Sequence, residues 1–190
     1  MSNYDAQYSA MCNNNGGIID DLILYKMPGG YFMVVNAGNI DKNITKGSLT
    51  SQLNRIGTSL LNQTLPKFFD KKILLQKQNE DNATYAKKIT PDIRKIDFNN
   101  DVSIIFNQIR AFSPKPSAWF SFNSHRINLI KCSMKICNAS PSKIINDQFH
   151  IGCNNGIIIP EIIQRQGKKP MEINEFLRGF TFEVGKKVNA

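Results

Sequence analysis

The stretch AWFSFNSHRINLIKCSMKI, at residues 118–136, decides the fold of this 190-residue chain. Its two β-rich runs flank an Asn-Ser pair that is typical of a tight turn. The pattern returns further on, where FHIGC at residues 149–153 and IIIPEII at residues 157–163 flank Asn-Asn-Gly. Short strands that alternate with tight turns predict a small antiparallel barrel, for which the five-stranded OB type is the natural candidate.

Two helical patterns border the predicted barrel. Asp101 begins DVSIIFNQIRAF, whose apolar residues recur at helical spacing, and Pro114 and Pro116 follow this pattern and end it. A second short helix is predicted for INEFLRGF at residues 173–180. We therefore predict an α+β fold in which the C-terminal domain is a small OB-like β-barrel with a flanking helix.

The N-terminal part of the chain has a different organisation. Two β-runs at residues 18–26 and 31–36 flank Pro-Gly-Gly and predict a hairpin. From Ser48 to about residue 65, apolar residues at helical spacing predict an amphipathic helix. Because two strands do not make a domain, we expect an orphan hairpin and an orphan helix. The polar stretch at residues 77–98 predicts an exposed connector that leads to a short helical turn after Thr90.

Composition excludes several classes of protein. The chain is 41% hydrophobic and 21% charged, and no apolar run approaches the roughly 18 residues that a membrane span needs. Its start lacks the basic and apolar regions of a secretory signal, so we expect a cytoplasmic protein. No cysteine pair and neither of the two histidines has metal-ligand spacing, so no metal site is predicted. Four free thiols are expected in a reducing compartment: Cys12, Cys132, Cys137 and Cys153.

The net charge of +9 is unevenly distributed. Residues 1–43 carry two lysines against four aspartates, whereas residues 44–190 carry 22 basic and 11 acidic side chains. An excess of +11 on one segment indicates a polyanionic partner, because phosphates that are neutralised by a protein release their counterions. A solvated, lysine-rich surface without a partner is the alternative.

From about residue 44 to its end, the chain resembles the C-terminal part of the methionyl-tRNA formyltransferase family. The motifs GSLTSQLNRIGTSLL, TLPKFF, KQNEDNATYAKKI, KIDF, IRAFSPKPSAW and GKKPMEINEFLRGF carry the resemblance, in the family's order. It implies that residues 44–69 are the last helix of the formyl-transferring domain. Residues 70–94 would be a basic linker, and residues 95–190 an OB-like domain that binds initiator methionyl-tRNA.

The same resemblance bears on catalysis. The family's catalytic Asn, His and Asp, and its loop for 10-formyltetrahydrofolate, lie upstream of the matching residues. His125 and His150 fall in barrel segments and do not replace them. We therefore assign no catalytic residue and no bound cofactor, and expect no formyl transfer by this chain alone.

Six basic residues are the candidates for tRNA binding. They lie in the connector and in a GKK loop between strand and helix: Lys87, Lys88, Arg94, Lys95, Lys168 and Lys169. Lys88 is the strongest candidate for a phosphate contact. A structural salt bridge is expected for Arg110 instead. Trp119 and Phe120 could stack on bases, but we expect both in the core.

Residues 4–43 resemble a different family, the aminomethyltransferase of the glycine cleavage system. AQYSAMCNNNGGIIDDLILYK and YFMVVNAGNIDKN carry this resemblance, and it implies tetrahydrofolate-binding positions at Tyr8, Asp21, Tyr25, Val34 and Asn36. The two patterns meet near Ile40–Asn43, as expected for a chimera. A fragment of a folate-dependent aminomethyltransferase and a chimera without function are therefore the alternatives to a tRNA-binding module.

Overall fold

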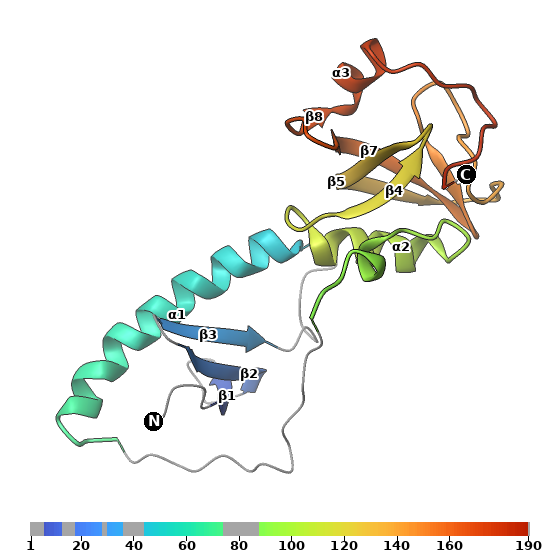
Figure 1. Ribbon diagram of the computed structural model, residues 1–190. Coiled ribbons are helices and arrows are strands. Elements are labelled where there is room, and N and C mark those ends of the chain that lie inside the picture. Colours follow the sequence, from blue (N-terminus) through green and yellow to red (C-terminus); the bar gives the residue numbers. More distant parts are fainter. Residues whose placement is uncertain (1–5, 13–17, 28–29, 36–43, 74–87, 190) are drawn as a thin grey trace. The chain divides into compact units, whose positions relative to one another are not determined.

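The computed structural model describes the backbone of residues 6–12, 18–27 and 30–35, and backbone and side chains of residues 44–73 and 88–189 (Figure 1). The chain divides into two compact units. Unit 1 comprises residues 1–44 and 48–87, and unit 2 comprises residues 45–47 and 88–190. The boundary between residues 87 and 88 falls inside the segment 70–94 that the sequence suggests is a linker.

Unit 1 contains a three-stranded antiparallel sheet in the order β1-β2-β3. Its strands are β1 (Ala6–Cys12), β2 (Ile18–Met27) and β3 (Gly30–Val35). The strands expected at residues 18–26 and 31–36 are present as β2 and β3, with Met27 opposite Gly30. β1 pairs with β2, so the sheet has one strand more than the sequence indicated. AQYSAMC in β1 is mostly small and polar, which explains why it gives a weak strand signal.

Helix α1 (Lys46–Phe69) is 24 residues long. It begins two residues before Ser48 and continues past residue 65, with Pro66 inside its last turn. None of its residues is buried, and its apolar side chains are partly in solvent, with Leu60 53% and Phe69 74% exposed. Because its apolar face is only partly covered, this helix derives less stability from packing than a helix that is buried on one side.

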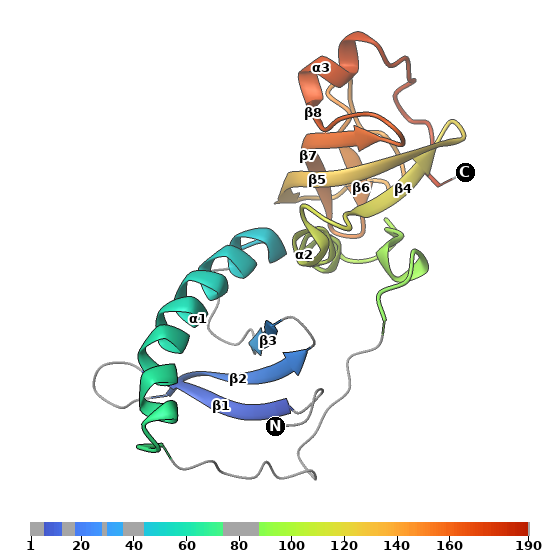
Figure 2. The ribbon, with the colours of Figure 1, turned by 60° about the vertical axis from the view of Figure 1, so that its left-hand side comes forward.

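Unit 2 is built on an antiparallel sheet in the order β4-β5-β7-β6, with β8 paired to β7 (Figure 2). The sheet curls into a half barrel, which fits a small barrel-like domain, and β5 contains register shifts between Leu129 and Cys132 that bend the strand. Four strands lie close to the predicted positions: β4 (Ala118–Phe122), β5 (His125–Ile136), β6 (Ile151–Cys153) and β7 (Gly156–Arg165). The two-residue strand β8 (Met171–Glu172) was not predicted from the sequence.

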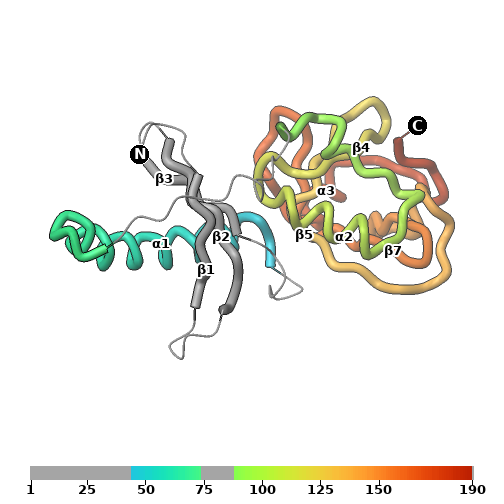
Figure 3. The backbone as a smooth tube through the Cα atoms, turned by 90° about the horizontal axis from the view of Figure 1, so that it is seen from below, coloured from blue at the N-terminus to red at the C-terminus, as the bar shows by residue number. Residues whose placement is uncertain are grey.

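Two helices flank this sheet. Helix α2 (Val102–Phe112) packs against β5 (Figure 3). Asp101 caps it, because the side-chain oxygen Oδ1 accepts a hydrogen bond of 2.8 Å from the backbone N–H of Ser103. Helix α3 (Ile173–Arg178) follows β8 and ends two residues before the predicted boundary. The short 3₁₀ helix η2 (Asp92–Arg94) is the helical turn expected after Thr90.

The hydrophobic core of unit 2 lies inside the half barrel. Strand β4 shows alternating burial, because Ala118, Phe120 and Phe122 point inward and Trp119 and Ser121 lie between them on the outer face. Aromatic side chains meet edge to face in the core, for example Phe149 and Phe182 with ring centroids 4.9 Å apart. Helix α2 contributes its buried stripe to the same core: Val102, Ile105 and Ile109. This packing fixes which side chains of the sheet face outward.

Within the part of the chain that the structure describes, no helix is long and apolar enough to cross a membrane.

Candidate nucleic-acid interface

The end of the connector, after residue 90, is attached to the rest of unit 2 through its backbone carbonyl groups. The indole Nε1 of Trp119 donates a 2.9 Å hydrogen bond to the carbonyl oxygen of Pro91. Gln108 Nε2 on α2 donates to the carbonyl oxygens of Ile93 and Lys95, at 2.9 and 3.2 Å. These bonds satisfy polar backbone groups along the domain edge and hold this part of the connector in one place.

Arg94 has a structural position in this connector. Its Nη1 donates to the carbonyl oxygens of Pro116 and Ser117, at 2.7 and 3.0 Å. Its Nε is buried and has no hydrogen-bond partner among the described residues. Arg94 therefore ties the connector to the loop that follows α2, and only part of its guanidinium group remains for a further ligand.

Two cationic side chains lie close to the outward-facing ring of Trp119. The guanidinium carbon of Arg126 lies 4.3 Å from the centroid of the ring, and Nζ of Lys95 lies 5.7 Å from it. These distances are within the range of cation–π contacts. Burial, and secondarily the charge of Arg94, lower the pKa of Arg126 below its ordinary value. We name Arg94, Lys95 and Arg126 together the Trp119 cation cluster.

The expectation that Trp119 and Phe120 both fill the core is right for Phe120 and wrong for Trp119. Phe120 is fully buried, whereas Trp119 is half-buried on the outer face of β4. The reason is the two-residue period of a strand, which puts neighbouring side chains on opposite faces. Arg126 is not among the residues predicted from the sequence, because a lone arginine after a turn gives no signal until the tertiary structure places it against Trp119.

The GKK loop lies between β7 and β8. Gly167 has a φ of 74°, a left-handed conformation that glycine adopts without steric cost. Lys168 and Lys169 are exposed. The loop is anchored to the sheet, because Gln164 Nε2 donates a 2.7 Å hydrogen bond to the carbonyl oxygen of Lys168. The backbone of the loop is therefore fixed while its two ammonium groups remain free to bind an anion.

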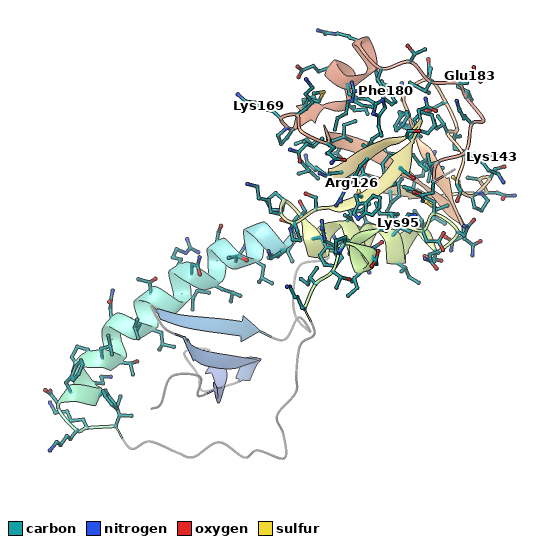
Figure 4. All side chains as sticks on the ribbon, viewed as in Figure 1. Lys95, Arg126, Lys143, Lys169, Phe180 and Glu183 are labelled. Atoms are coloured by element: carbon teal, nitrogen blue, oxygen red, sulfur yellow. The ribbon has the colours of Figure 1, made fainter. Side chains whose placement is uncertain are left out.

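A polar row connects the Trp119 cation cluster to the GKK loop. The sheet register places Trp119 opposite Asn128, and Asn128 opposite Gln164. Asn128 Nδ2 donates to Gln164 Oε1 at 3.2 Å, and the buried Oδ1 of Asn128 has no partner among the described residues. In the view of Figure 4, Arg126 lies between Lys95 and Lys169, and Lys143 lies at the opposite edge of unit 2.

The predicted tRNA-binding residues thus form two groups within unit 2. Lys88, Arg94 and Lys95 belong to the connector, Lys88 being exposed, and Lys168 and Lys169 belong to the loop. Lys87 lies outside the described residues. Arg110 contacts its own helix α2, with Nη2 donating to Asn107 Oδ1 at 2.6 Å and its guanidinium carbon 5.2 Å from the ring of Phe106. Its expected salt bridge stays a prediction.

The predicted folate positions fall outside the part of the chain with described side chains. Tyr8, Asp21, Tyr25 and Val34 are backbone positions on β1–β3, and Asn36 lies beyond them. The side chain of Cys12 is likewise outside this part. The folate assignment stays a prediction.

The chemistry available in the described part of unit 2 is that of anion binding. No group of three or more His, Cys, Asp or Glu side chains among the described residues could hold a metal ion. Cys132, Cys137 and Cys153 are free thiols, and burial raises the pKa of Cys132 and of Cys153 to about 12, which keeps both protonated and poorly nucleophilic at neutral pH. His150 is half-buried beside Asn146, and burial lowers its pKa.

Comparison with known protein families finds one that unit 2 resembles. Residues 88–181 match the family described as formyl transferase, C-terminal domain. The match covers most of unit 2, including the end of the connector from residue 88, the half barrel and α3. Unit 2 therefore resembles the C-terminal domain of formyl transferases over these residues.

Individual curated relatives show which formyl transferases the chain resembles. The methionyl-tRNA formyltransferase of Ehrlichia chaffeensis is 35% identical over 146 residues, which is 75% of this chain and 46% of that protein. That of Rhizorhabdus wittichii is 36% identical over 143 residues, 74% of this chain and 46% of that protein. Over about three quarters of its length, the chain is homologous to methionyl-tRNA formyltransferases. It spans about half the length of these relatives.

A solved structure shares the fold. HypX from Aquifex aeolicus in complex with tetrahydrofolic acid superposes with a TM-score of 0.63 at 13% identity. The likeness covers 88% of this chain and 33% of HypX. At this identity the likeness concerns the fold alone.

Proposed function

We propose that this chain is the C-terminal, tRNA-binding part of a methionyl-tRNA formyltransferase and that it binds initiator methionyl-tRNA in translation initiation. The observation that carries the proposal is that homology to these enzymes coincides with a basic outer face. The matched residues 88–181 include both the connector and the GKK loop.

In this proposal the RNA backbone crosses the outer face of an OB-like barrel. Lys88 and Lys95 would contact phosphates on the connector side, and Lys168 and Lys169 on the loop side. The support for this path is the polar row from Trp119 through Asn128 to Gln164, which leads from one basic group to the other. Lys87 belongs to the same set by its position in the sequence, and Arg94 would act mainly by holding the connector.

Formyl transfer is assigned to a part of the enzyme outside residues 44–190. The family resemblance puts the catalytic Asn, His and Asp upstream, together with the loop for 10-formyltetrahydrofolate. No carboxylate of the described residues hydrogen-bonds to either histidine: His125 is exposed near Phe180, and His150 shares its hydrogen bond with Asn146, although the charge of Asp147 lies near it. We therefore assign tRNA binding to this chain, and neither catalysis nor a cofactor.

The alternatives concern residues 1–43. An aminomethyltransferase-like folate segment and a chimeric origin rest on the sequence resemblance, and no comparison supports them. The homology to formyltransferases favours the tRNA-binding function for the rest of the chain. Titration of the chain with tetrahydrofolate tests the folate segment directly, because a bound pterin would change both its own absorbance and the protein fluorescence.

Fluorescence anisotropy tests the proposed function. Labelled initiator methionyl-tRNA is titrated with the chain, and elongator tRNA and an unstructured RNA of equal length serve as competitors. We expect saturable binding that weakens as the salt concentration rises. Among the competing RNAs, initiator methionyl-tRNA should be the strongest competitor. Equal competition by all three RNAs would reduce the function to general affinity for polyanions, and salt-independent binding would contradict a phosphate-based interface.

A formylation assay tests the division of labour. The chain alone, with 10-formyltetrahydrofolate and charged initiator tRNA, is expected to bind RNA without transferring the formyl group. Turnover by protein that is shown to be free of host enzyme would contradict this assignment.

A further inference from the structure

The Trp119 cation cluster combines an aromatic platform with positive charges that have no anionic partner among the described residues. Neither of the ion pairs between described side chains, Lys72–Asp70 and Lys131–Glu161, involves a member of the cluster. Arg126 is half-buried, and both burial and the nearby charge of Arg94 disfavour its charged form. Like charges gathered on one partly desolvated face cost free energy, which an anionic ligand would offset.

The contact with Trp119 determines how Arg126 can bind a ligand. A guanidinium group whose carbon is 4.3 Å from a ring centroid lies at stacking distance. Stacking uses the face of the guanidinium group and leaves its N–H groups at the edge available for hydrogen bonds. Those N–H groups match the spacing of two phosphate oxygens, whereas the ring face that Arg126 covers is closed to a nucleobase.

We propose that Arg126, held against Trp119, forms with Lys95 a binding site for one backbone phosphate of RNA. This site rests on the proposed function and extends it by a residue outside the six predicted ones. Trp119 acts as a positioning residue, because it orients the guanidinium group and, through its bond to Pro91, fixes the connector that carries Lys95. The polar row across β5 and β7 continues from this site to the GKK loop.

Trp119 is the only tryptophan of the chain, so its fluorescence reports on this site. The experiment titrates the chain with a 12-nucleotide oligouridine and with initiator methionyl-tRNA. Binding is followed in parallel by tryptophan emission and by anisotropy of the labelled RNA, at several salt concentrations. The variants are Arg126→Gln, Arg126→Lys and, as a control that removes the same charge at the opposite edge of unit 2, Lys143→Gln.

We expect tryptophan emission and anisotropy of the unaltered chain to give the same binding curve. Arg126→Gln should weaken binding about tenfold at low salt and reduce the slope of log affinity against log salt by about 0.7, the value of one phosphate contact on a single strand. Arg126→Lys should keep the slope but lose part of the affinity, because it retains the charge without the two-pronged geometry. Lys143→Gln should change affinity by less than about twofold.

Three results would overturn the site. The first is that Arg126→Gln binds RNA as tightly as Lys143→Gln does. The second is that Arg126→Lys loses as much affinity and as much of the salt slope as Arg126→Gln. The third is that anisotropy reports binding while the emission of Trp119 stays constant. A destabilised Arg126→Gln chain would be recognised by a lower unfolding temperature. In that case the affinity of Arg126→Lys and the tryptophan emission of the unaltered chain decide whether the site exists. The proposed function is tested separately: if initiator tRNA binds no better than other RNA while oligouridine still reports at Trp119, the phosphate site stands and the tRNA function fails.

Discussion

The indole Nε1 of Trp119 donates a hydrogen bond of 2.9 Å to the carbonyl oxygen of Pro91, which fastens the basic connector to strand β4. The backbone N–H of Ile96 adds a second bond, to the carbonyl oxygen of Trp119, at 2.8 Å. The connector therefore enters the domain at a fixed place, and the basic residues next to it are held at the edge of the sheet.

Replacing Trp119 by Phe is expected to loosen this attachment. Phe keeps an aromatic ring but lacks the N–H, so the bond to Pro91 is lost at a cost of about 1 kcal/mol. Hydrogen exchange should become faster at the backbone amides of Arg94 and Lys95, which bond within the η2 turn. The amide of Ile151, in β6, serves as an internal control. Unchanged exchange in the turn would show that the other hydrogen bonds suffice to hold the connector.

Lys88→Ala should weaken the binding of initiator tRNA about fivefold at low salt and flatten the salt dependence, because one phosphate contact is removed. Lys143→Ala is the control, since Lys143 is half-buried and lies at the far edge of unit 2. Filter binding at several salt concentrations measures both. Equal losses from the two substitutions would assign the effect of Lys88 to general basicity.

A fragment of residues 88–190 should fold on its own. In limited proteolysis of the whole chain, residues 1–65 should be degraded before unit 2. The core of unit 2 consists of residues from 96 to 188, whereas no residue of α1 is buried. Limited proteolysis of the whole chain should give a stable C-terminal product that begins in or just after the polar connector. Early cleavage inside β4–β7 would contradict this, as would a stable product that contains residues 1–65.

Gly152→Ala should strongly destabilise unit 2. A Cβ atom at this position in β6 would collide with the backbone oxygen of Ser140 and lie 2.9 Å from Cδ1 of Ile145, so backbone must move, at a cost of about 2 kcal/mol or more. Gly179→Ala is the matched control, because nothing lies within 4 Å of its Cβ position. Urea unfolding measures the difference. A Gly152→Ala variant as stable as Gly179→Ala would mean that the 140–145 loop adjusts freely.

Stability should fall above pH 9 because of the buried thiol of Cys153. Burial raises its pKa to about 12, so between the ordinary thiol pKa and pH 12 the unfolded chain releases a proton that the folded chain retains. Deprotonation thus favours the unfolded state as the pH rises, and the stabilising contribution is fully present only below the unfolded pKa. From pH 9 to pH 10 the loss should be about 1 kcal/mol for this thiol.

The Cys153→Ala variant isolates this effect from other titrating groups. Its free energy of unfolding is lower at every pH because a cavity forms, but it should decline less between pH 9 and pH 10 than that of the unaltered chain. Parallel declines of the two chains in urea unfolding would show that the thiol ionises equally in both states.

The sequence by itself determined most of the secondary structure of unit 2 and led to the proposed class of its partner. Alternating apolar residues and turn signals located β4, β5, β6 and β7 within a few residues, and Asp101 marked the start of α2, because these signals are local. The concentration of positive charge after residue 43 indicated a polyanion without reference to the fold. The same local rules missed β1, since its residues are weak strand formers that need a neighbour to pair with.

Only the tertiary structure decided which face of the sheet a single residue occupies and which side chains it contacts. Trp119 and Phe120 are adjacent and both aromatic, but they point to opposite faces of β4, and only the packing of the half barrel shows that Phe120 faces the core and Trp119 the outside. Arg126 gains its place because β5 pairs with β4 and brings its guanidinium group to the ring of Trp119. The free energy of such contacts depends on distance and burial between residues that pairing brings together, and neither quantity is encoded in the spacing of residues along the chain.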